Sequence, residues 1–247
     1  MLIRPGDDGA LAIGQLSHSW LAGQLARPWG NERFGGVEPR EEVVLGAEQH
    51  DIGWALFDLE PRFNPDTGLP RSFLELTVAD HLAIWRDAPD HLLTQSLQAA
   101  LVVSMHGSSL SELRAAARPA DAERVRDHID AEHARQRALR ERLGVSEAEA
   151  ERTRRQMWTW DGLSLALCHG WRPFVARDVP TADDDLVEVT LADDDTLHPW
   201  PFALEQVEVR CEARRLAPRY DDEAAMLEGF AAAPVETVRF ALAPAPA

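Results

Sequence analysis

The spacing of apolar residues changes once along the chain, near Trp171, and this change constrains the fold more than any other feature. Before it, several segments place apolar side chains at helical intervals. After it, LVEVTL and QVEVRCEA alternate apolar and polar residues, as half-buried strands do. We therefore predict a mainly α fold, with a helical domain over residues 1–171 and a small antiparallel β subdomain over residues 172–247 packed on it. A predicted hairpin over residues 1–14 is available to join that sheet.

Capping residues and helix breakers divide the helical domain into separate helices. Ser17 and Ser146 are suited to cap helices, Thr77 begins a sequence that resembles a capping box, and Gly144 stops a long polar helix. Pro89 ends a helix because proline lacks the amide donor. The predicted helices run from Ser17 towards Pro28, over 41–58, from Thr77 to before Pro89, over 90–106, over 121–143 and from Ser146 to Cys168.

Composition narrows the function classes. The 247 residues carry a formal charge of −17, which repels phosphate backbones and anionic lipids, so we expect neither nucleic acid nor a membrane as partner. No lysine occurs, which excludes Schiff-base chemistry. Two cysteines make no disulfide framework, and no run approaches 18 apolar residues. We expect a cytoplasmic protein that acts on a small molecule.

A series of histidines and aspartates lies on or beside separate predicted helices. Its members are His18, His50, Asp51, His81, His106 and Asp161. Helical bundles build metal sites from inward-facing imidazoles and carboxylates, and these donors suit first-row divalent ions. His50 and Asp51 would lie about 100° apart on one helix, close enough to approach one ion. The series therefore predicts a site for one or two divalent ions among Fe, Mn, Zn, Ni, Co and Mg.

His91 is an alternative to His81 as a ligand. On one helix, His91 and His106 would lie roughly 22 Å apart, too far to share a site. His81 precedes the break at Pro89 and is free to fold back towards His106, so we prefer it.

These residues and their neighbours resemble a known signature. His18, QHDIGW, His81, SMHG and WDGLSL are similar to the H…HD…H…H…D pattern of the HD superfamily of metal-dependent phosphohydrolases. Together with SHSWLAGQLARPWG, NPDTGLPRSF and DGLSLALCHGW they resemble a bacterial family of unknown function within that superfamily. The resemblance implies an HD-domain-like helical bundle. It also implies a first ion held by His18, His50, Asp51 and Asp161, and a second completed by His81 and His106 with Asp51 bridging.

Further residues are candidates for catalysis or substrate binding at this site. We name Asp51 and Asp58 as catalytic candidates, since Asp58 shares the predicted helix face of Asp51 and would line its pocket. Trp54, Arg86 and Arg155 are candidates for substrate binding, because an arginine grips phosphate with two hydrogen bonds.

The expected function is hydrolysis of a small phosphorylated molecule by metal-activated water. Two alternatives stay open: an HD-type di-iron oxygenase acting on a small organic substrate, and a non-catalytic binding or structural module with a vestigial metal site. We also predict a homodimer, because Val125, Ile129, Leu139 and Leu143 form an apolar stripe on the polar helix over 121–143.

Overall fold

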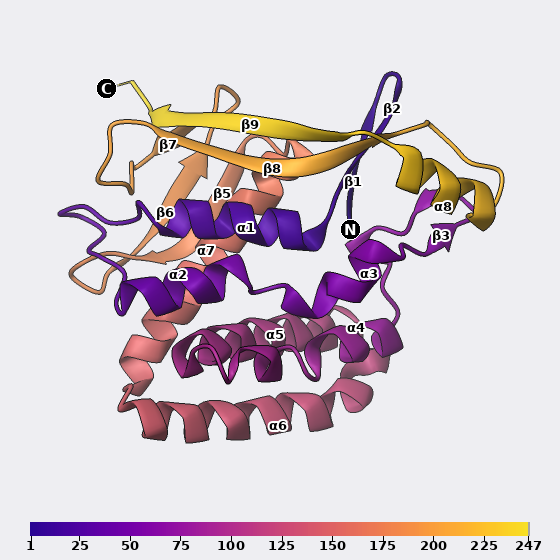
Figure 1. Cartoon of the computed structure of the whole chain (residues 1–247). Coiled ribbons are helices and arrows are strands. Elements are labelled where there is room, and N and C mark those ends of the chain that lie inside the picture. The colour runs from indigo at the N-terminus through magenta and orange to yellow at the C-terminus, as the bar shows by residue number, and fades with distance from the viewer. Residues whose placement is uncertain (247) are drawn as a thin grey trace.

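The computed structural model describes residues 1–246. They form a curved sheet that helices cover. The helices are α1 (Gln15–Ala26), α2 (Arg40–Glu48), α3 (Ala55–Leu59), α4 (Val78–Trp85), α5 (Leu97–Ala117), α6 (Pro119–Leu143), α7 (Glu147–His169) and α8 (Glu223–Ala232), with short 3-10 helices η1 (Ile52–Trp54), η2 (Phe73–Glu75) and η3 (Pro89–Leu92). The strands are β1 (Leu2–Gly6), β2 (Gly9–Ile13), β3 (Phe63–Asn64), β4 (Leu69–Pro70), β5 (Phe174–Pro180), β6 (Leu186–Leu191), β7 (Thr196–His198), β8 (Val207–Leu216) and β9 (Val235–Pro244). In Figure 1 the long strands β8 and β9 lie beside α1, and α5 and α6 lie at the opposite side of the molecule.

The predicted fold class, mainly α with a small C-terminal sheet, is wrong. Seven strands form one sheet in the order β1-β2-β8-β9-β7-β6-β5, and only the β7–β9 pair among these neighbours is parallel. The hairpin over residues 1–14 forms as predicted and enters this sheet, because β2 pairs with β8 from Ala10↔Leu216 to Ile13↔Ala213. Local alternation identified the strands, but it carries no information on how many of them pair across the chain.

The main core lies between the sheet and the helices α1, α2 and α7 (Figure 1). Leu21 of α1 and Trp160 of α7 are buried in the same cluster as Val189 and Val209 of the sheet. Trp29 packs edge-to-face on Trp160 and on Phe202, which lies between β7 and β8. The core thus contains residues from both sides of position 171, where we placed the domain boundary. That boundary stays a prediction.

The helix ends follow the predicted capping chemistry in most places. Thr77 and Ser146 both form capping boxes, and Gly144 ends α6 with a φ of 70°, the left-handed conformation that glycine adopts without strain. Ser17 does not cap α1, which starts at Gln15. Its hydroxyl instead donates to the carbonyl of Glu212 on β8 at 2.9 Å and ties α1 to the sheet.

The stripe on α6 packs within the chain. Val125 and Leu139 are buried, and α6 lies along α5, where Ser104 donates a 2.7 Å hydrogen bond to the buried carboxylate of Glu132. The burial of Val125 and Leu139 removes the exposed surface on which we based the homodimer. The homodimer stays an untested prediction. Within residues 1–246, no helix has the length and apolar character needed to cross a bilayer.

Candidate metal centre

His18 lies on α1, with its ring buried against α7. Its Nδ1 lies 2.7 Å from the hydroxyl of Ser164, which itself donates to the carbonyl of Asp161 at 2.9 Å. Because the serine proton is used in that bond, Ser164 accepts a hydrogen bond from Nδ1–H of His18. The other ring nitrogen, Nε2, is left facing two carboxylates.

His50 and Asp51 lie in the turn after α2, and the prediction that they share a helix is wrong. α2 ends at Glu48, and the chain turns through both residues before η1. Gly53 explains part of this break, since a Cβ there would lie 2.0 Å from the carbonyl oxygen of Ile84. His50 Nδ1 donates to the carbonyl of Ala47 at 2.9 Å, so its Nε2 also points inward.

Four donor atoms meet at this point of the interior. His18 Nε2 lies 3.1 Å from Asp51 Oδ2 and 3.2 Å from Asp161 Oδ1, while His50 Nε2 lies 3.5 and 3.4 Å from the same two oxygens. The two Nε2 atoms are 3.3 Å apart. Donors bound at about 2.0–2.2 Å to one ion lie about 2.9–3.5 Å from one another at octahedral or tetrahedral angles. The spacing of the two nitrogens from each other and from both oxygens is therefore in the range expected for ligands of a single first-row divalent ion.

His106 of α5 completes the cluster. His18, His50 and Asp51 form one group of potential ligands, and His50, His106 and Asp161 form another. Both groups use His50, whose Nδ1 is already hydrogen-bonded, and a single imidazole nitrogen binds only one ion. The two groups therefore describe one site with five donors. His106 Nδ1 is buried and has no hydrogen-bond partner within residues 1–246, which leaves it free to act as a donor to a ligand.

The protonation states of the clustered side chains suit a site that holds either a proton or a metal cation. Burial alone would lower the pKa of His18, but hydrogen bonds to Asp161 and Asp51 raise it to about 9. Burial lowers the pKa of His106 to about 4, so this ring is neutral. Burial opposes ionisation of Asp51 and Asp161, yet the surrounding histidines hold the pKa of both carboxyl groups below the usual value. Without a cation, a protonated His18 offsets one of the two buried negative charges.

His81 lies in the same cavity but outside this cluster. Its Nε2 donates to Ser111 at 2.8 Å, since the Ser111 hydroxyl donates to the carbonyl of Gly107. The two groups of potential ligands within residues 1–246 do not include it. His91 is exposed on η3, so of the two alternatives it is His81 that the fold turns inward.

A cavity of about 290 Å³ opens above the cluster. His18, Asp51, His106 and Asp161 lie on its wall, and so does Trp54, one of the predicted substrate-binding residues. The remaining wall is mostly apolar and comes from η2, α4, α5 and α7.

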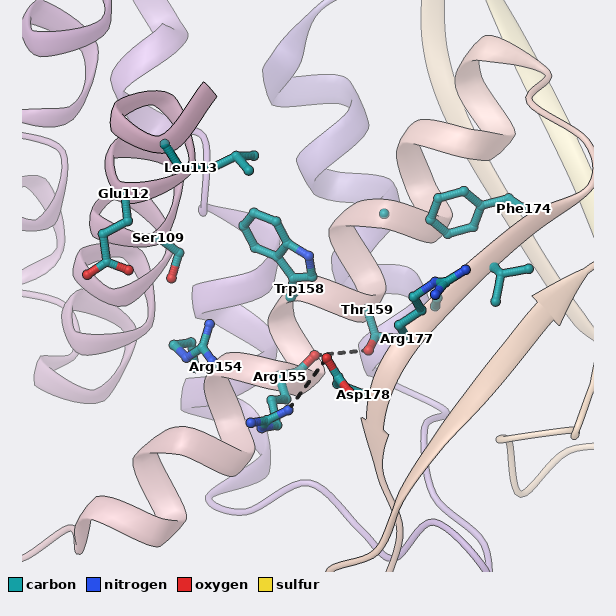
Figure 2. Close-up of a pocket in the computed structure, with 14 residues that line it drawn as sticks. Ser109, Glu112, Leu113, Arg154, Arg155, Trp158, Thr159, Phe174, Arg177 and Asp178 are labelled. Carbon is teal, nitrogen blue, oxygen red and sulfur yellow. Dashed lines mark hydrogen bonds and ion pairs between the residues drawn. The ribbon is translucent and has the colours of Figure 1, made fainter. Parts of the chain in front are cut away.

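Three predicted site residues lie elsewhere. Asp58, at the end of α3, accepts a 3.1 Å hydrogen bond from the backbone of Leu16 and lines a different cavity. Arg86 is exposed at the end of α4. Arg155 lies in a cavity of about 640 Å³ between α5, α7 and β5, where it pairs with Glu151 at 2.8 Å and with Asp178 at 4.0 Å (Figure 2).

The sequence analysis missed Gln15, Ser164 and two arginines. Gln15 is buried, lines the cavity above the cluster, and its Oε1 has no partner within residues 1–246. Arg114 and Arg118 line the same cavity from the C-terminal end of α5 and the residue after it. Gln15 lies three residues before His18, and Ser164 lies three residues after Asp161. A search for polar residues one helical turn from each predicted ligand would have found both.

A family model described as a protein of unknown function (DUF3891) matches residues 1–218. The chain belongs to this family. The DUF3891 match covers the chain from β1 to the end of β8 and includes all five clustered residues. No curated protein and no solved structure matches the chain.

The resemblance to the HD superfamily is overturned by these findings. The matching family is DUF3891, and the seven-stranded sheet is foreign to a purely helical HD domain. The resemblance rested on the order of histidines and aspartates, and that order is a consequence of any site built from successive helices. The oxygenase alternative loses the HD resemblance on which it was based and stays an untested prediction.

Proposed function

We propose that this chain is a metal-dependent hydrolase of small phosphoesters with a single divalent ion. The observation that carries the proposal is a pair of imidazole nitrogens 3.3 Å apart, each 3.1–3.5 Å from the same two carboxylate oxygens, beside a cavity. Three imidazoles and two carboxylates favour a first-row ion such as Zn, Fe, Mn, Co or Ni over Mg, which prefers oxygen ligands. The set of donor atoms is the same whichever of these ions is bound, so elemental analysis identifies the metal.

The residues of the chain hold the ion and orient the reactants. A bound divalent ion supplies Lewis acidity and lowers the pKa of a coordinated water. Ser164 and the carbonyl of Ala47 fix the rings of His18 and His50 through their Nδ1 atoms. The free Oε1 of Gln15 offers an acceptor for a proton of water or substrate.

The reaction transfers a phosphoryl group to water. The bond from phosphorus to the ester oxygen breaks, a new bond forms between phosphorus and the water oxygen, and a water proton ends on the released alcohol. Asp51 and Asp161 are ionised carboxylates on the wall of this cavity, and Arg114, paired with Asp121, lies on the same wall. The cavity volume of about 290 Å³ suits a small substrate.

Elemental analysis tests the metal site. Protein purified without chelator is expected to hold about one first-row ion per chain, and Asp161→Asn is expected to lose it. His133→Ala is the matched control, because His133 is an exposed histidine of α6 that pairs with Glu112. Metal-free wild type in every preparation would contradict the proposal.

Hydrolysis of phosphoesters is the second measurement. Metal-loaded wild type is expected to release phosphate from small esters, and Asp161→Asn is expected to lose this activity. A protein that holds the ion but releases phosphate from no small ester would point to the remaining alternative, a binding module.

A further inference from the structure

The cavity above the metal cluster has two chemically distinct parts. Four of the five clustered residues line one part of it: His18, Asp51, His106 and Asp161. Most of the rest of the wall is apolar and includes Phe73, Leu74 and Leu76 from the η2 segment, and Leu110 and Leu113 from α5. Its polar members are Gln15, His81, Arg114 and Arg118. A ligand that reaches the cluster therefore contacts hydrocarbon over most of its length.

The apolar wall extends to the surface. Leu74 is 58% exposed and Leu113 is 54% exposed, and both line the cavity. These two leucines come from different elements, so apolar side chains of both elements reach the surface at this cavity. An occupant that covers them removes apolar surface from water.

Two arginines hold this wall in place. Arg114 donates to the carbonyl of Leu76 at 3.2 Å and pairs with Asp121 at 2.7 Å, and Arg118 donates to the carbonyl of Leu74 at 3.4 Å. The guanidinium groups thus fix the η2 segment against the end of α5. The apolar wall is attached to the helical body by these bonds and is not an isolated loop.

We propose that the substrate is an amphiphilic phosphoester whose alcohol is an alkyl or aryl group. This inference rests on the proposed function: the phosphate lies at the ion, and the apolar group lies along the wall from Leu110 to Leu113 and Leu74. Sugar phosphates and nucleotides are poor substrates, because their hydroxyls would lose hydrogen bonds to water against this wall.

Binding of alkylphosphonates of increasing length tests the proposal without relying on turnover. Methylphosphonate, butylphosphonate and hexylphosphonate are titrated calorimetrically into the metal-loaded protein. Each buried methylene contributes about 0.8 kcal/mol, about a fourfold gain in affinity. We expect the Kd to fall by about threefold or more per methylene from methyl to butyl.

A pair of leucine variants locates the effect. Leu113→Gln is expected to reduce the gain from methyl to hexyl at least fivefold while leaving methylphosphonate binding unchanged. Leu186→Gln is the control, because Leu186 is a similarly exposed leucine on β6 outside the cavity.

The outcomes separate the two proposals. An affinity that does not change with chain length, in protein that holds its ion and binds methylphosphonate, overturns the amphiphilic substrate and leaves the hydrolase intact. Protein that holds no ion overturns the hydrolase, and the inference that rests on it falls as well. A gain that survives Leu113→Gln unchanged also overturns the assignment of the apolar group to this wall.

Discussion

Ser164 contacts His18 on the side away from the carboxylates and sets which ring nitrogen faces the cluster. Bonds of this kind to a metal-binding histidine typically change metal affinity by 10–100-fold. We expect Ser164→Ala to weaken metal binding by about tenfold or more, measured by competition with a chromophoric chelator. Ser109→Ala is the control, because Ser109 is a buried serine of α5 whose hydroxyl donates to its own helix. Equal affinities in the two variants would contradict the role of Ser164.

His81 makes the stability of the metal-free protein depend on pH. Burial lowers the pKa of His81 from 6.5 to about 4. Below pH 6.5 the unfolded chain takes up a proton that the folded chain refuses, so the free energy of unfolding falls as the pH falls from 6.5 to 4. His81 alone accounts for a loss of about 2 kcal/mol between pH 7 and pH 5.

Urea unfolding of wild type and His81→Gln at pH 7 and pH 5, both with chelator, checks this prediction. Glutamine does not titrate, so the variant should lose about 2 kcal/mol less than wild type over the same interval. The same loss in both proteins would show that His81 is not the responsible group.

The sequence identified the clustered residues better than the residues that support them. His18, His50, Asp51, His106 and Asp161 were predicted as a set and meet in the structure. Their chemistry is distinctive, and each follows or lies on a helix. Gln15 and Ser164 were missed because a polar residue on a helix is more often a solvated or capping residue, and only packing against α1 and α7 shows otherwise.

At the scale of elements, α7 carries both Asp161 and Ser164, and Ser146 caps its far end. Ser146→Ala removes the hydroxyl that accepts from the amide of Glu149 and donates to its carboxylate, and should lower the free energy of unfolding by about 1 kcal/mol. Metal content should stay unchanged, because the cap lies at the opposite end of the helix from Asp161. Urea unfolding and elemental analysis of the same preparation check the two parts. Loss of the ion would mean that the two ends of α7 are not independent.

The segment around His50 shows why a regular apolar pattern can predict a longer helix than the one that forms. Val43, Val44, Ala47, Trp54 and Phe57 are spaced as on one continuous helix. The chain nevertheless turns after Glu48, since the close approach of Gly53 to the backbone of Ile84 excludes a longer side chain. Long-range contacts of this kind leave no local signal besides the glycine itself.

On the scale of the whole molecule, the ion would link α1, the turn after α2, α5 and α7. A ligand that binds only the folded chain stabilises it by about 4 kcal/mol at a thousandfold excess over its Kd. A chelator should therefore lower the Tm of wild type by several degrees and leave the Tm of Asp51→Asn unchanged. Differential scanning fluorimetry measures both, and a wild-type Tm that ignores the chelator would contradict a bound ion.

The sheet was the part of the molecule that the sequence could not predict. β1, β2, β6 and β8 were each identified from alternation or turn signals, but their order in the sheet was not. Register between β2 and β8 depends on residues nearly the whole length of the chain apart. An alternating pattern predicts that a segment forms a strand, but it does not identify the strand with which that segment pairs.

The pairing of β2 with β8 also has a consequence for biosynthesis. A ribosome adds roughly 5–20 residues per second, so the hairpin leaves the exit tunnel roughly 10–40 seconds before β8 has been made. During that interval the free edge of β2 carries unpaired amides and carbonyls next to the apolar side chains of Leu11 and Ile13, which are buried in the finished protein. Nascent chains stalled before β8 would therefore be the form of this protein that chaperones bind and that aggregates first.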